Sequence, residues 1–96
     1  MAQTPEKAVK QKVVKILNSY GAYHFPPATY GLGRSGIPDI VGSYKGKFFA
    51  IECKAGKNKP TALQLREMIA INDSGAQAIV VNENNIGDVA KLLESL

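Results

Sequence analysis

The sequence predicts an α/β protein in which helices flank a mixed central sheet, with elements in the order α-β-β-β-α-β-α. Two observations carry this prediction. Apolar residues recur at helical spacing in three segments, and short strand-like runs lie between those segments instead of being grouped together. A chain of 96 residues has the length of one domain, so we expect residues 1–96 to form a single folded unit.

The first predicted helix begins at Thr4, a residue type that caps helices, and Pro5 follows at the first helical position. Gly21 is expected to end this helix. One face between these bounds is apolar at helical spacing, and it consists of Val9, Val13, Ile16, Leu17 and Tyr20. This face is therefore expected to pack on the core.

Three strands are predicted in the middle of the chain. A short one spans residues 22–25 and is followed by a glycine-rich loop at residues 28–37. The next two, residues 39–44 and 47–54, are joined by a tight turn at Lys45-Gly46. The last two strands therefore form a hairpin.

A second helix is capped by Thr61 and runs to about Ser74. We expect its buried face to centre on Leu65, Met68 and Ile69. Glu67 is expected to be solvated. A buried strand at residues 77–81 and a helix within residues 86–96 complete the fold.

The composition limits the function classes. Lys and Arg number 12 against 8 Asp and Glu, and residues 1–48 carry seven of these bases against two acids. The first half of the chain is thus the candidate face for an anionic partner. One cysteine and one histidine argue against disulfides, cysteine-built zinc sites and most histidine-based triads. No apolar stretch approaches the roughly 18 residues of a membrane span. We therefore expect a cytoplasmic protein without a membrane partner.

The glycine-rich loop contains a G-x-G-x-x-G pattern from Gly31 to Gly36. In dinucleotide-binding proteins this pattern opens a helix, whereas here a strand follows, so we expect no nucleotide cofactor. Within the same loop, Arg34 and Ser35 are candidates for phosphate contacts and Tyr30 for stacking on a base or sugar. A plain surface loop is the alternative.

The residues that carry chemistry lie in the predicted hairpin. Counting from its turn places Asp39 opposite about residue 52, so Asp39, Glu52 and Lys54 converge at one end of the hairpin. Two converging carboxylates suit a hard divalent cation such as Mg²⁺, and the main-chain carbonyl of Cys53 is a third candidate ligand. Lys54 can then orient or deprotonate a water, or neutralise charge on the transition state.

The ordered set Gly36-Ile37-Pro38-Asp39, Ile51-Glu52-Cys53-Lys54 and Thr61-Ala62-Leu63-Gln64 resembles the PD-(D/E)XK nucleases. Within that superfamily it is most similar to the virus-type replication-repair nuclease domain, VRR-NUC, in the stand-alone form found in phages and prophages. The resemblance implies a restriction-endonuclease-like core. It also implies a Mg²⁺- or Mn²⁺-dependent endonuclease that cuts DNA, similar to Holliday-junction resolvases and acting as a homodimer.

The resemblance also implies roles for individual residues. Asp39 and Glu52 match the metal-binding acids, with the Cys53 carbonyl beside them, and Lys54 matches the motif lysine. Gln64 matches a glutamine in the helix after the core strands and is a further candidate catalytic residue. Glu6 matches an acid that begins the first helix and is a candidate catalytic residue and metal ligand. For Glu6, a favourable acid at a helix N-terminus remains the alternative.

Four lysines in the two loops around the motif, Lys45, Lys47, Lys57 and Lys59, are candidate phosphate contacts expected to bracket the site. The alternative to an endonuclease is a non-catalytic DNA-binding module derived from the same fold. Such a module should lack one of the two acids or the lysine, and none is missing. A metabolic enzyme with an acidic metal site is a more distant alternative, because it would need a closed pocket.

Overall fold

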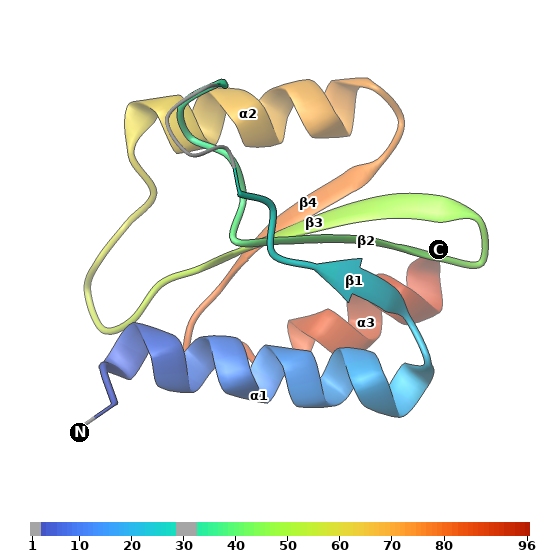
Figure 1. The fold of residues 1–96 in the computed structure, drawn as a ribbon, viewed down its shortest axis with the longest axis horizontal. Helices are drawn as coiled ribbons and strands as arrows, with labels where there is room; N and C mark the ends of the chain where they lie inside the picture. The colour runs from blue at the N-terminus through green and yellow to red at the C-terminus, as the bar shows by residue number, and fades with distance from the viewer. Residues whose placement is uncertain (1–2, 29–32) are drawn as a thin grey trace.

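The computed structural model describes residues 3–28 and 33–96 and contains a four-stranded sheet between helices (Figure 1). The elements along the chain are α1 (Pro5–Tyr20), β1 (Tyr23–Phe25), β2 (Ile40–Tyr44), β3 (Lys47–Cys53), α2 (Ala62–Asp73), β4 (Gln77–Val81) and α3 (Asp88–Ser95). The predicted order of elements is confirmed, and the predicted bounds differ by no more than two residues.

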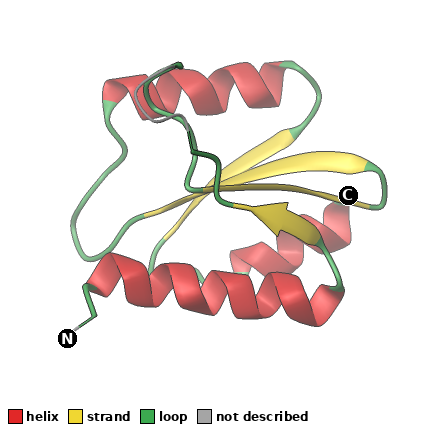
Figure 2. Cartoon of the chain, viewed as in Figure 1, coloured by secondary structure: helices red, strands yellow, loops and turns green. Residues whose placement is uncertain are grey.

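The sheet has the strand order β1-β2-β3-β4, in which β1, β2 and β3 are antiparallel and β4 runs parallel to β3. It is therefore mixed, as predicted. Helix α2 covers one face of the sheet, while α1 and α3 cover the other (Figure 2). The central strand β3 is buried from Phe49 to Cys53 between these layers. Any charged side chain on that part of β3 must be paired or used in chemistry.

Helix α1 forms for the local reasons that its sequence indicates. The Thr4 hydroxyl accepts a hydrogen bond from the Lys7 N–H at 3.1 Å, and Gly21 closes the helix in the left-handed conformation. Its buried residues Val9, Val13 and Leu17 lie one turn apart and join the larger core cluster with β3 and α3. The N-terminal turn of α1 is thereby held beside the end of β3.

The β2–β3 hairpin has the predicted turn. Lys45 and Gly46 both have positive φ, 53° and 77°, as a two-residue hairpin turn requires. This turn sets a register in which Ile40 lies opposite Ile51. One step further along the same register, Asp39 lies opposite Glu52.

Helix α2 is oriented differently from the prediction. Met68 packs on the sheet in a small cluster of short side chains, but Leu65 and Ile69 are 47% and 59% exposed. Glu67, expected to be solvated, is buried instead. The predicted buried face was thus wrong for Leu65, Ile69 and Glu67. Apolar residues occur on two sides of this helix, so their spacing alone does not decide which side meets the sheet.

Among the residues that the structure describes, no helix has the length and apolar character needed to cross a membrane.

Candidate active site

Asp39 and Glu52 come together where β2 begins and β3 ends. The Asp39 Oδ2 atom accepts a hydrogen bond from the Cys53 N–H at 2.8 Å. This bond continues the hairpin by one residue and orients the carboxylate toward its neighbour on β3. Because the N–H and C=O of one strand residue point to the same side, the Cys53 carbonyl also faces Asp39. The geometry expected for these two acids is therefore present.

Glu52 is a buried acid, 2% exposed, on the central strand of the sheet. Burial raises the pKa of its carboxyl, the negative charge of Asp39 raises it further, and the Lys54 ammonium opposes both, so the pKa is about 7. A strand pattern alone would place an apolar residue here. A carboxylate held at such a cost is typical of a functional site.

Lys54 and Gln64 both bind the Oε2 atom of Glu52. The Lys54 ammonium lies 3.5 Å from Oε2, and the Gln64 side-chain N–H donates to the same atom at 2.9 Å. Gln64 is held in turn by a capping box, in which its Oε1 accepts from the Thr61 N–H at 2.8 Å. The start of α2 therefore orients Glu52. The predicted inward direction of Gln64 agrees with this geometry.

The donor set fits a divalent metal ion. The second carboxylate oxygen of Glu52, Oε1, is buried and has no hydrogen-bond partner. A buried carboxylate oxygen normally has a partner, and a hard cation would provide one. Nowhere in residues 3–28 and 33–96 do three His, Cys, Asp or Glu side chains gather as a metal cluster. The two carboxylates and the Cys53 carbonyl are oxygen donors, the ligand type that Mg²⁺ and Mn²⁺ accept together with water.

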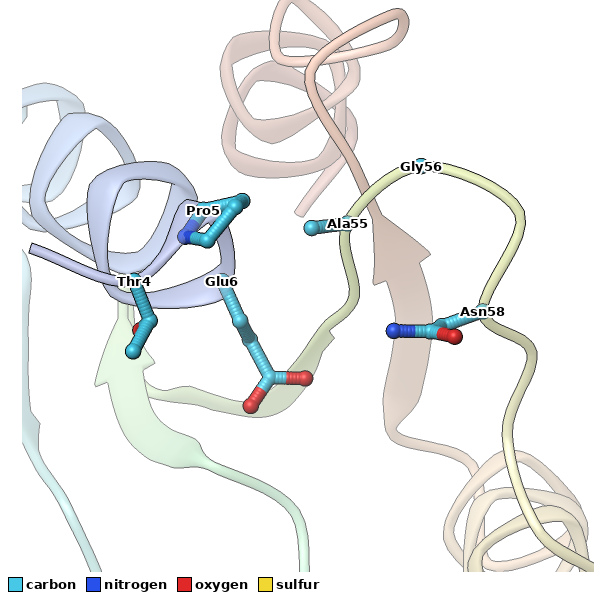
Figure 3. A pocket seen from close by; sticks show the side chains of 6 residues that line it. All are labelled: Thr4, Pro5, Glu6, Ala55, Gly56 and Asn58. Atoms are coloured by element: carbon cyan, nitrogen blue, oxygen red, sulfur yellow. The ribbon is translucent and has the colours of Figure 1, made fainter.

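Glu6 lies apart from the two strand acids. Its carboxylate projects from the first turn of α1, with Ala55, Gly56 and Asn58 across a pocket of about 390 Å³ (Figure 3). It is not gathered with Asp39 and Glu52 into a set of three carboxylates within the described part of the chain. The structure thus brings Glu6 near the site without making it a direct partner of the pair.

Cys53 faces the core cluster between the sheet and α1. Burial and the nearby Asp39 carboxylate raise the pKa of its thiol to about 12. Its side chain is therefore unsuited to act as a nucleophile.

Lys10 is a site residue that the sequence analysis missed. Its ammonium lies 3.6 Å from Oδ1 of Asp39, so each of the two acids has its own lysine. Lys10 follows Glu6 by four residues and shares its side of α1. This four-residue spacing from Glu6 was the sequence feature that could have identified Lys10 as a site residue.

The candidate DNA-binding lysines do not all lie near the site. Lys57 and Lys59 are exposed in the loop that follows Lys54. Lys45 and Lys47 lie at the turn of the hairpin, and Asp39 and Glu52 lie at its open end. Five residues of strand separate Lys47 from Glu52 by roughly 17 Å. The prediction that Lys45 and Lys47 bracket the site was wrong, because a hairpin turn and its open end lie at opposite ends.

The loop before β2 is tied to α2. The Arg34 guanidinium donates to the buried Glu67 carboxylate at 3.0 and 3.2 Å. Ser35 is exposed beside it, and Tyr30 lies outside the described residues. Glu67 was a second missed residue. It shares a helix face with Gln64 and Ile71 at spacings of three and four, which was the signal for its burial.

The protein has a mixed sheet with helices on both faces, two acids and a lysine at one end of the central strands, and a glutamine that reaches them from α2. These features define the restriction-endonuclease-like class of nucleases. No family model matches the sequence. The chain is 33% identical to "Putative nuclease p44" of Acyrthosiphon pisum secondary endosymbiont phage 1, over 88% of this chain and 89% of that protein. It superposes on a solved structure described as a VRR_NUC domain with a TM-score of 0.75 and 27% identity, over 96% and 97% of the two chains. The chain belongs to the VRR-NUC family of nuclease domains.

The fold extends to a more distant structure. The Holliday junction resolvase Hjc of Archaeoglobus fulgidus matches with a TM-score of 0.59 and 23% identity, over 80% of this chain and 65% of that one. At this level of identity the match shows the shared fold.

Proposed function

We propose that this nuclease is a Mg²⁺- or Mn²⁺-dependent endodeoxyribonuclease that cuts branched DNA in the cytoplasm, with residues 1–96 acting as one domain. The observation that supports the proposal most directly is the meeting of Asp39, Glu52 and Lys54 at one end of the hairpin, where one Glu52 carboxylate oxygen is buried without a partner. Branched DNA is favoured because a Holliday junction resolvase shares the fold.

Asp39, Glu52 and the main-chain carbonyl of Cys53 would hold the metal ion. When bound, such an ion lowers the pKa of a water and neutralises charge on a phosphate. Gln64 keeps the Glu52 carboxylate in one orientation, so the ligand need not be ordered during the reaction. Lys54 is largely shielded from solvent, at 14% exposure, where its charge is screened less than at the surface. It would orient the attacking water or stabilise the charge that develops on the phosphate.

Around this centre, Lys57 and Lys59 would bind the phosphates next to the cut, and Arg34 and Ser35 would contact the backbone from the loop before β2. Tyr30 is the candidate for stacking on a base. Lys45 and Lys47, at the far end of the hairpin, would meet a different part of the DNA.

Glu6, near the end of β3, would act on the site from a distance or through water.

The variants Asp39→Asn, Glu52→Gln and Lys54→Ala are each expected to lose metal-dependent nicking by at least about 100-fold, because each removes charge that acts in the transition state. The assay compares four-way junction, flap, nicked, single-stranded and linear duplex DNA with Mg²⁺ or Mn²⁺. Lys91→Ala, a change at an exposed lysine on α3 that has no proposed role at the site or in DNA contact, is the matched control and should retain cleavage.

Two outcomes would count against this proposal. Full cleavage by a purified Lys54→Ala protein would remove the assigned role of the lysine. Binding of junctions without cleavage under either metal would favour the alternative of a non-catalytic DNA-binding module.

We also propose that the protein is a homodimer formed through the outer face of α2. Leu65 and Ile69 lie one turn apart on this face, and both are exposed. Apolar side chains grouped on a surface favour association, and two copies would provide the two active sites that paired cuts in a junction require.

Leu65→Asp combined with Ile69→Asp is expected to convert the dimer to a monomer, since a dimer would have to bury both carboxylates. Sedimentation velocity measures the mass of each variant. Tyr23→Ser, which removes an exposed aromatic residue from the edge strand β1, is the control and should leave the dimer intact. A dimer that survives the α2 changes but is lost in Tyr23→Ser would place the interface on β1.

A further inference from the structure

Asp39 and Glu52 differ in whether their second carboxylate oxygen already has a partner. Each acid has one oxygen engaged in holding the site together: Oδ2 of Asp39 binds the Cys53 N–H, and Oε2 of Glu52 binds Gln64 and Lys54. Of the remaining two oxygens, Oε1 of Glu52 has no partner, whereas Oδ1 of Asp39 lies 3.6 Å from the Lys10 ammonium. An incoming cation would find one oxygen free and the other occupied.

We propose that Lys10 is a positioning residue that takes the place of the divalent cation at Asp39, and that DNA releases it. This inference rests on the proposed metal dependence. In the absence of metal, Lys10 balances the Asp39 charge and keeps that carboxylate in its binding orientation. A cation that takes Oδ1 must displace the ammonium, so Lys10 lowers the metal affinity of the free protein.

The DNA step follows from the exposure of Lys10. Its side chain is 38% exposed, compared with 14% for Lys54, so it can turn outward while Lys54 remains in place. A DNA phosphate at the site offers the ammonium a new anionic partner and leaves Asp39 to the metal. Metal and DNA binding would therefore strengthen each other, as linkage between two sites requires.

The test measures Mn²⁺ binding by isothermal titration calorimetry at pH 7.5, first without DNA. Lys10→Met, which keeps the length of the side chain and removes its charge, is expected to bind Mn²⁺ roughly two- to five-fold more tightly than the wild type. This is the size expected for loss of a part-exposed ion pair. Lys10→Arg should restore weak binding, because it restores the charge. Lys12→Met removes an exposed lysine from the same helix and should bind like the wild type.

The second arm adds a four-way junction, in the Lys54→Ala background to prevent cleavage. The junction is expected to tighten Mn²⁺ binding when Lys10 is present and to have a smaller effect in Lys10→Met. Equal or weaker Mn²⁺ binding by Lys10→Met without DNA would show that Lys10 does not compete with the cation for Asp39. An equal effect of the junction on Mn²⁺ binding with and without Lys10 would show that DNA does not release Lys10 from Asp39. A wild-type protein that binds no Mn²⁺ would instead contradict the proposed metal dependence itself.

Discussion

Glu52→Gln is expected to make the metal-free protein more stable above pH 7 while it abolishes cleavage. Folding raises the pKa of Glu52 from 4.5 to about 7, so the folded protein holds this proton more tightly than the unfolded chain. Protonated Glu52 therefore contributes its full stabilisation to the wild type below about pH 4.5. This contribution is lost as the pH rises through 7. The loss is on the order of 3 kcal/mol at 1.36 kcal/mol per pKa unit. Glutamine has no charge to lose, and its oxygen can still accept from Gln64.

The measurement is urea unfolding of both proteins in EDTA between pH 4.5 and 8.5. The stability difference between Glu52→Gln and the wild type should grow up to about pH 7 and then level off. Asp73→Asn, a change at an exposed carboxylate at the end of α2, is the control and should show no such trend. Parallel pH profiles for Glu52→Gln and the wild type would contradict the assigned state of Glu52.

Gly36→Ala is expected to cause the largest loss of stability among changes at the positive-φ glycines that the structure describes. A Cβ atom at this position would lie 2.5 Å from the backbone C and O of Leu63 and 2.8 Å from the Gln64 N atom. The residue also has a φ of +80°, which an L side chain adopts only with strain. Strain of about 1–2 kcal/mol and overpacking of about 1–3 kcal/mol together predict a loss of roughly 2–5 kcal/mol.

Gly46→Ala separates the two causes. Gly46 has nearly the same φ, +77°, but a Cβ there would meet nothing within 4 Å. It should therefore lose only the strain contribution of about 1–2 kcal/mol. Denaturant unfolding of both variants measures the difference, and equal losses would show that the contact of Gly36 with α2 is unimportant.

Gly36→Ala should also impair cleavage, measured well below its unfolding midpoint. To relieve the contact, the first turn of α2 must shift, and this turn carries the Gln64 amide that holds Glu52. Loss of such a supporting contact typically lowers metal affinity or activity by about 10- to 100-fold. Gly46→Ala lies at the far end of the hairpin and should retain cleavage.

Two polar residues of α2 lie on the side of the helix that faces the rest of the protein. Gln64 binds Glu52 and Glu67 binds Arg34, so the helix joins the central strand to the loop before β2. The apolar residues Leu65 and Ile69 face outward in exchange. The helix thus works as a support for the site on one side and is available for a partner subunit on the other.

The sequence alone determined the order of the elements and the pairing of Asp39 with Glu52. Both depend on local information: capping residues and hydrophobic spacing define the elements, and the two-residue turn at Lys45-Gly46 sets the hairpin register. Gln64 was also predicted to face inward, because its helix position relative to Met68 is a local property.

The tertiary structure alone decided the contacts between elements that are distant in the sequence. The pairs Lys10–Asp39 and Arg34–Glu67 depend on how α1 and α2 dock on the sheet, and short-range spacing contains no information on docking. The same docking turned Leu65 and Ile69 outward, although their spacing suits a buried face equally well. Closeness in the sequence also did not predict closeness in space for the candidate DNA-binding lysines, since Lys47 and Lys57 lie toward opposite ends of β3. The sequence therefore located the two acids, and the packing of the helices determined which cations accompany them.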